Sequence, residues 1–193
     1  SFSYIWDYSE KTSFKSRTTA YQSISDLSTN SSLVRVESSV SIKHEINERF
    51  TFFGRYLFRL NTPLVEGGPN ENRITEQITY TSKFSNYSTA QRLRIDHHFI
   101  PDNYQTRVRY KFGATFPLKK SAKSTYLVIS DEILAKFADQ TFSGGNRIEI
   151  GTGWNPHPKR KIEISVEYRT KNYFIDTPLE RTVVISTTFN FKH

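Results

Sequence analysis

Apolar and polar residues alternate with a period of two along most of the chain. In the segment 183–191, Val183, Ile185 and Phe189 are apolar, whereas Ser186 and Asn190 occupy intervening positions. This period places successive side chains on opposite faces of a β-strand, because a helix would repeat near 3.6 residues. The pattern predicts eleven strands, at 2–8, 13–22, 34–43, 50–60, 73–81, 92–99, 107–116, 124–134, 147–154, 161–169 and 183–191.

Two of these segments do not have one apolar and one polar face. In 73–81, Glu76 shares a face with Ile74 and Ile78, so either a bulge redirects its side chain or that face is not fully apolar. In 124–134, Tyr126 and Leu127 are adjacent and both apolar. For 124–134 we therefore predict a strand without assigning its faces.

The connections between the segments indicate an antiparallel meander that forms one domain, residues 1–193. Longer and shorter connections tend to alternate from the C-terminus, in the order 171–180, 155–159, 137–146, 117–123, then 61–72, 44–48, 24–33 and 9–12. The connection 100–104 is the exception, being short where a long one is expected. Outer-membrane barrels join their strands by short periplasmic turns and longer external loops. None of the connections is long enough to be a domain linker.

Composition narrows the class of protein. The chain has 193 residues and no Cys, with 36% hydrophobic and 15% aromatic residues. The lack of Cys excludes a disulfide scaffold, a thiolate zinc site and a cysteine nucleophile. The aromatic content argues against a disordered chain. The longest apolar run, residues 126–129, is too short for a transmembrane helix, which needs about 20 apolar residues.

Three features favour a membrane β-barrel over a soluble barrel or sandwich, which would alternate in the same way. Most segments reach the about 9–11 residues that cross a bilayer, whereas soluble strands average about five or six. The last strand closes on Phe189-Asn190-Phe191, followed by Lys192 and His193, and resembles the C-terminal signal of bacterial outer-membrane barrels. Aromatic rings, which favour the membrane–water interface, lie near the ends of the apolar tracks and predict a lipid-facing girdle of Phe50, Phe58, Phe116, Trp154, Tyr168, Phe189 and Phe191.

The sequence therefore predicts an all-β fold, an antiparallel up-and-down transmembrane β-barrel of 10–12 strands in the outer membrane of Gram-negative bacteria. Single-chain bacterial barrels usually have an even number of strands. Eleven segments would then mean ten strands if 2–8 or 13–22 is not a barrel strand, or twelve if one strand is not recognised. A soluble β-barrel or sandwich is the alternative.

The charged residues gather on the face opposite the apolar one. The net charge is +8, from 27 basic and 19 acidic residues. Arg–carboxylate pairs would form a structural network that plugs a narrow lumen. An excess of Arg would instead suit a narrow passive pore favouring small anions, since uncompensated Arg in a dry lumen is costly. The predicted lumen-facing set is Arg35, Glu37, Arg55, Arg59, Arg73, Arg92, Arg94, Asp96, Arg107, Arg109, Lys111, Arg147, Glu149, Glu163, Glu167 and Arg169, with Lys43 and Lys161 in the same phase.

Candidate chemistry is sparse. A rim hydrolase would use the acidic and histidine residues that fall near the outer ends of two strands, Asp96, His97, His98, Asp102, Asp131 and Glu132. The five His residues show no metal-ligand spacing, so we expect no metal and no cofactor. Positive charge is interleaved on one strand face and not gathered into a patch, which argues against nucleic-acid binding. Basic turns such as 119–123 suit anionic lipid headgroups.

From about Asn72 onward the chain resembles a family of small bacterial outer-membrane β-barrel proteins known only as a domain of unknown function. The residues that carry the resemblance are Asn72-Arg73-Ile74-Thr75-Glu76-Gln77, Gln91-Arg92-Leu93-Arg94-Ile95-Asp96-His97-His98-Phe99, Arg107-Val108-Arg109-Tyr110, Tyr126-Leu127-Val128, Asp131-Glu132, Gly145-Asn146-Arg147-Ile148 and Asn190-Phe191. The resemblance implies the barrel fold and the outer-membrane location and leaves the activity open.

Taken with the residue pattern, these observations lead us to expect a protein without catalytic activity. The first hypothesis is a structural or accessory subunit of an outer-membrane protein complex, with outer-membrane lipid and other outer-membrane proteins as partners. A narrow pore favouring small anions is the alternative, and a rim hydrolase is a distant third.

Overall fold

The computed structural model describes residues 2–24, 31–61, 70–118, 125–138, 141–157, 160–174 and 178–191. Side chains are described in these ranges except at 22–24, 31–34, 157, 190 and 191. Every structural statement below concerns this part of the chain. Within it, no helix is long and apolar enough to cross a membrane.

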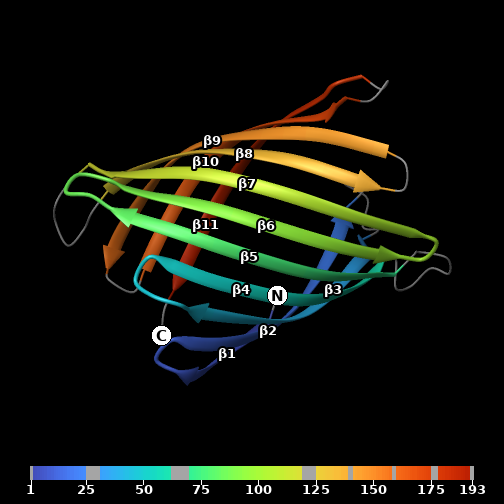
Figure 1. Ribbon diagram of the computed structural model, residues 1–193, viewed down its shortest axis with the longest axis horizontal. Helices are drawn as coiled ribbons and strands as arrows, with labels where there is room; N and C mark the ends of the chain where they lie inside the picture. Colours follow the sequence, from blue (N-terminus) through green and yellow to red (C-terminus); the bar gives the residue numbers. More distant parts are fainter. Residues whose placement is uncertain are drawn as a thin grey trace. The chain divides into compact units, whose positions relative to one another are not determined.

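The described residues form an all-β structure of eleven strands, one in each segment predicted from the alternation (Figure 1). The strands are β1 (Phe2–Ser9), β2 (Thr12–Ile24), β3 (Ser31–Glu45), β4 (Phe50–Asn61), β5 (Glu71–Lys83), β6 (Ser88–Ile100), β7 (Asn103–Pro117), β8 (Thr125–Ala138), β9 (Thr141–His157), β10 (Arg160–Tyr173) and β11 (Glu180–Phe191). Both of the weak N-terminal segments are strands, and the described sheet has eleven strands, within the predicted range of 10–12. β-Branched and aromatic residues, which favour extended backbone, are frequent in these strands.

The strands form one antiparallel up-and-down sheet in the order β1 to β11, so that each strand pairs with its neighbour in sequence. The register of the first strands aligns polar positions. Lys15 in β2 lies opposite Ser41 in β3, which lies opposite Arg55 in β4. Four residues further along, Glu37 in β3 lies opposite Arg59 in β4. Because side chains alternate between faces, these pairings keep the charged residues together on one face of the sheet.

Burial is reversed relative to a soluble protein. In β4, Arg55 and Arg59 are partly buried, whereas Phe52 and Phe58 on the opposite face are each 38% exposed. Among the described residues, only two apolar side chains are buried, Leu57 and Tyr126. The buried polar residues are Glu71, Thr75, Asp96, His98, Ser130, Glu132, Ser165 and Thr170. Soluble proteins bury their apolar side chains and leave charged ones exposed, whereas in this sheet the apolar face is the exposed one.

The structure also assigns the two faces that the sequence left open. In β8, Tyr126 and Glu132 are buried on one face, and Ile129 and Ile133 are exposed on the other. In β5, Glu76 is exposed together with Ile74 and Ile78, so the apolar face of this strand carries a carboxylate.

The predicted alternation of long and short connections is only partly correct. The connection expected at 137–146 spans just residues 139 and 140, because β9 already begins at Thr141. Gly144 and Gly145 lie inside β9 and do not form a turn. A Cβ atom at Gly145 would fall 2.8 Å from the backbone oxygen of Thr170, so this glycine allows close approach to β10.

The chain divides into two compact units. The first unit comprises Ser1–Ile78, Arg94–Arg107 and Ala138–Gln140, and the second comprises Thr79–Leu93, Val108–Phe137 and Thr141–His193. Each unit contains its own network of buried polar side chains.

Candidate functional site

The first unit is organised around Glu71, the first residue of β5, whose side chain is 5% exposed. Its Oε1 accepts hydrogen bonds from Arg73 Nε at 2.8 Å and Arg73 Nη2 at 2.6 Å, and it lies 2.7 Å from His98 Nδ1. Its Oε2 accepts a hydrogen bond from Arg59 Nη1 at 2.5 Å. Arg73 reaches Glu71 because residues two apart share a strand face. A buried carboxylate is stabilised when charged donors surround it in this way.

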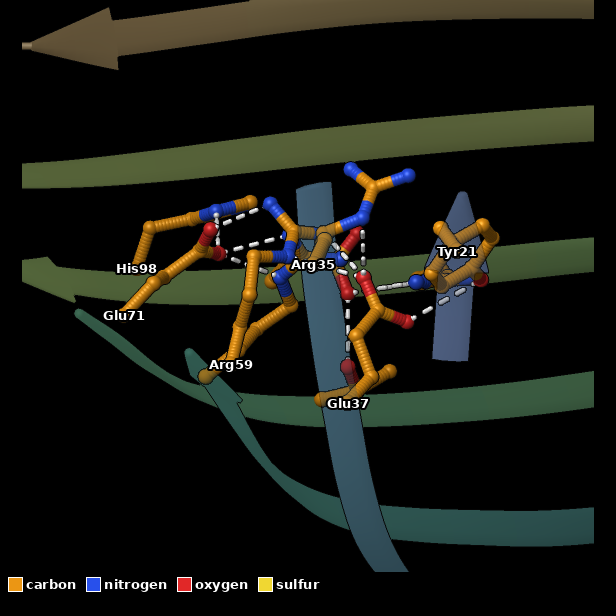
Figure 2. A network of polar contacts seen from close by, with 10 residues as sticks. Tyr21, Arg35, Glu37, Arg59, Glu71 and His98 are labelled. Carbon is orange, nitrogen blue, oxygen red and sulfur yellow. Dashed lines mark hydrogen bonds and ion pairs between the residues drawn. The ribbon is translucent and has the colours of Figure 1, made fainter. Parts of the chain in front are cut away.

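Arg59 extends this network to β3 (Figure 2). Its Nε and Nη2 both lie 2.8 Å from Oε1 of Glu37, so one guanidinium joins two carboxylates. Tyr21 donates its hydroxyl to Glu37 Oε2 at 3.3 Å. Arg35 Nε lies 3.5 Å from Glu37 Oε1, and its guanidinium is 4.2 Å from the centre of the Tyr21 ring. The network therefore connects β2, β3, β4, β5 and β6 on the polar face.

A second buried carboxylate of this unit, Asp96 in β6, is 1% exposed. Its Oδ1 accepts hydrogen bonds from Thr75 Oγ1 at 2.7 Å and from Arg94 Nε and Nη2 at 2.9 and 2.8 Å. Arg94 and Asp96 are again two residues apart in one strand. The hydroxyl of Thr75, which is itself 1% exposed, ties β5 to β6 at a point without solvent.

The second unit is organised around Glu132 in β8, whose side chain is also 5% exposed. Its Oε1 accepts a hydrogen bond from Arg92 Nη2 at 2.7 Å, and its Oε2 accepts one from Arg109 Nη2 at 2.5 Å. Arg147 Nη1 lies 3.7 Å from the same Oε2. Each unit thus contains one buried glutamate that meets three basic side chains.

Further pairs extend the second network along β7, β9 and β10. Lys111 Nζ lies 2.9 Å from Glu149 Oε2, and Ser130 donates to the same oxygen at 3.2 Å. Glu167 and Arg169 are also paired. At the far end, the Nζ of Lys161 lies 2.8 Å from Oε2 of Glu163.

Tyr126 fills the space beside that last pair. It donates its hydroxyl to Glu163 Oε2 at 2.9 Å, and Lys161 Nζ lies 5.3 Å from the centre of its ring. The ring lies directly on Gly153 of β9, where an added Cβ would fall 1.9 Å from Tyr126 Cζ. Gly153 is therefore required for the buried position of Tyr126.

The polar face of the sheet contains every member of the predicted lumen-facing set, each of them buried or partly buried. Whether this face encloses a lumen stays a prediction. Of the predicted girdle, Phe50, Phe58, Phe116, Trp154, Tyr168 and Phe189 are exposed on the apolar face, and the side chain of Phe191 lies outside the described residues.

Sequence reasoning missed Glu71 and left the face of Glu132 open, and these two residues are the network centres. The pattern places Glu71 in the connection 61–72, although it is in phase with Arg73 and Thr75, and extending the alternation backward finds it. Glu132 is predicted near the outer end of its strand without an assigned face, because both faces of 124–134 begin with apolar residues.

The residues proposed for a rim hydrolase do not share one face of the sheet or one set of partners. Asp96 and His98 are buried on the polar face, whereas His97 lies on the other face with Nδ1 2.7 Å from the hydroxyl of Tyr104. Asp131 is exposed and accepts a hydrogen bond from Asn146 Nδ2 at 2.5 Å. In the described residues no group of three or more His, Cys, Asp or Glu could hold a metal ion.

Aromatic residues pair at the connections between strands. Of the residues in these pairs, only Phe116 was predicted as part of the aromatic girdle. Phe84 and Tyr87, in the β5–β6 connection, stack with ring centres 4.5 Å apart, and Tyr87 lies 5.9 Å from Phe116 of β7. At the β6–β7 turn, Phe99 and Tyr104 lie 5.2 Å apart. Rings therefore gather at both ends of β6.

Comparison with known protein families gives one match. The family model described as "Protein of unknown function (DUF2490)" matches residues 1–178. The match includes the first third of the chain, where the sequence resemblance was looser, and ends before Asn190-Phe191. None of the curated proteins matches the chain.

Proposed function

Since the chain belongs to the DUF2490 family, whose function is unknown, we propose its function from the structure: a non-catalytic outer-membrane β-barrel that serves as a structural or accessory subunit of an outer-membrane protein complex. In this proposal the sheet closes on itself, the polar face lines the interior, and the apolar face contacts lipid.

The observation that carries the proposal is the reversed burial of the sheet. Val183, Ile185 and Phe189 of β11 are 62%, 74% and 59% exposed, while Glu71 and Glu132 on the polar face are 4% exposed. Exposing apolar side chains to lipid has no free-energy cost, whereas exposing them to water is unfavourable. Strands of 8 to 17 residues include many long enough to cross a bilayer, which takes about 9–11 tilted residues.

The aromatic pairs support the same placement. Phe84 and Tyr87 lie at one end of β6, and Phe99 and Tyr104 lie at the other. Outer-membrane barrels carry aromatic girdles at both membrane interfaces, because these rings favour the boundary between hydrocarbon and water.

The ion-pair networks support a structural role over an open channel. Glu71 and Glu132 each meet three basic groups, and Glu37, Asp96, Glu149, Glu163 and Glu167 are paired as well. Such ion-paired networks hold side chains in one arrangement and occupy the interior of a small barrel.

The exposed position of Glu76 supports the proposal that a partner protein docks on the apolar face. It is exposed near the middle of β5, between Ile74 and Ile78, which are 42% and 41% exposed on the same face. In the described residues it makes no ion pair. A carboxylate at bilayer depth is costly against lipid. A docked protein offering a cation or a hydrogen-bond donor would remove that cost.

Membrane placement is tested by fractionation and by gel mobility. We expect the protein in the outer-membrane fraction, extracted only by detergent, with a mobility that shifts on heating. A protein that stays in solution without detergent would overturn the proposal.

The accessory role is tested by photo-crosslinking in intact cells. A photoreactive residue in place of Glu76 should capture one protein in a defined adduct, whereas the same residue in place of Ile133, exposed on the apolar face of β8, should not. Equal capture at both positions, or none at position 76, would contradict the role.

A narrow anion-favouring pore is the second candidate, favoured by the excess of basic groups on the polar face. Planar-bilayer recording separates the two functions. Stable anion-selective conductance steps would establish the pore and overturn the proposal that side chains fill the interior.

A further inference from the structure

Arg55 in β4 differs from Arg59, Arg73 and Arg94 on its face because no carboxylate pairs with it in the described part of the chain. Arg59 and Arg73 bind Glu71, and Arg94 binds Asp96. In the described part of the chain Arg55 has no ion pair, and its buried Nε has no hydrogen-bond partner. Directly opposite in β3 lies Ser41, which supplies a hydroxyl and no negative charge.

The neighbours of Arg55 are themselves basic. Arg94 and Arg73 place positive charge close enough to act on it, and Asp96 and Glu37 are the carboxylates that oppose them. Both carboxylates already pair with other arginines. Arg73 and Arg94 bind their carboxylates through Nε and Nη2.

The charges on the polar face of β3 to β7 in the first unit do not balance. Besides the Lys43–Glu45 pair, the polar face of β3 to β7 in this unit has six guanidinium groups and three carboxylates, a difference of three positive charges, contributed by Arg35, Arg55, Arg59, Arg73, Arg94, Arg107, Glu37, Glu71 and Asp96. Partly buried guanidinium groups of like charge are stabilised by a counter-anion.

We propose that the polar face of β4–β6 binds a tetrahedral oxyanion, such as phosphate or sulfate, with Arg55 as its principal ligand and Arg73 and Arg94 flanking it. The planar guanidinium of Arg55 presents its donors in a fork that matches two oxygens of such an anion. This site goes beyond the proposed structural role, since it assigns a solute to the interior.

The test measures binding of inorganic phosphate to the full chain in a phosphate-free non-ionic detergent, by equilibrium dialysis with labelled phosphate. The wild-type protein should bind one phosphate per chain in a saturable manner. Arg55→Gln should weaken binding at least tenfold, because a charge-assisted hydrogen bond to the anion is lost. Arg55→Lys, which keeps the charge and loses the fork, should fall between them.

The matched control is Arg49→Gln, in the exposed β3–β4 turn, which should leave binding unchanged. In phosphate-free buffer Arg55→Gln should unfold at the same temperature as the wild type or higher, and phosphate should raise the unfolding temperature of the wild type alone. The proposal is overturned if the wild type shows no saturable binding, if Arg55→Gln binds as tightly as the wild type, or if chloride at equal ionic strength displaces phosphate completely. Failure of Arg55→Gln to fold would also contradict it, because the side chain would then have a required partner. None of these outcomes bears on the membrane placement.

Discussion

Replacing Glu132 by Gln tests whether the buried networks stabilise the fold. The substitution keeps the shape of the side chain and removes its charge. Arg92 and Arg109 would each lose a charge-assisted hydrogen bond, and Arg147 would lose its nearest negative charge. Hydrogen bonds to charged groups contribute about 1.5–3 kcal/mol, and breaking a buried ion pair from one side costs about 3–5 kcal/mol.

The side chains of Arg92 and Arg147 are 29% and 23% exposed, so solvent screens part of this loss. We therefore expect Glu132→Gln to lower the free energy of unfolding by about 3 kcal/mol, at the lower end of that range. The assay is urea unfolding of the detergent-solubilised protein, followed by tryptophan fluorescence and by heat-modifiable gel mobility.

The control is Glu180→Gln, the same substitution in an exposed ion pair. Glu180 Oε2 lies 2.8 Å from Lys171 Nζ, and both side chains are more than half exposed, so the loss should be about 0–1 kcal/mol. Equal costs for the two substitutions would refute the reasoning, because burial would then add nothing to the ion pairs of the polar face.

Three further predictions also concern the free energy of unfolding, the first two measured in detergent and the third in lipid vesicles. Gly153→Ala should cost about 1–3 kcal/mol, because the added methyl group displaces the ring of Tyr126. Most of this cost should vanish when Tyr126 is also replaced by Ala. Additive effects of the two substitutions would contradict the contact between Gly153 and the Tyr126 ring. Thr75→Val should cost about 1–3 kcal/mol, because it removes the hydroxyl that donates to Asp96 at 2.7 Å. Thr182→Val, the same substitution at an exposed position, should change stability little. Similar costs for the two substitutions would contradict a stabilising Thr75–Asp96 hydrogen bond. Ile150→Lys, at a 54% exposed position on the apolar face, should cost about 2–4 kcal/mol in lipid vesicles; Ile150→Leu is the control, and a tolerated lysine would argue against contact with lipid.

The alternation of residues determined much of this protein. A period of two assigns each side chain to one of two faces without knowledge of any partner, so all eleven strands and the polar positions, such as Arg55 and Arg59, were predictable.

Local pattern failed where a residue depends on contacts from another strand. Gly144 and Gly145 were assigned to a connection, yet they lie in β9 where β10 approaches closely. Tyr126 has apolar neighbours in sequence, and its face is decided by the space above Gly153 and the hydrogen bond to Glu163.

The partners of the charged residues were decided only by the tertiary structure. Sequence placed Arg92, Arg109 and Arg147 on one face but not around Glu132, because they come from three different strands whose pairing depends on register. A shift of one residue in one strand would move its side chains to the other face and leave these charges unpaired. The alternation therefore fixes which face is charged, and the register of the folded sheet fixes which charges neutralise one another and leaves Arg55 without a carboxylate.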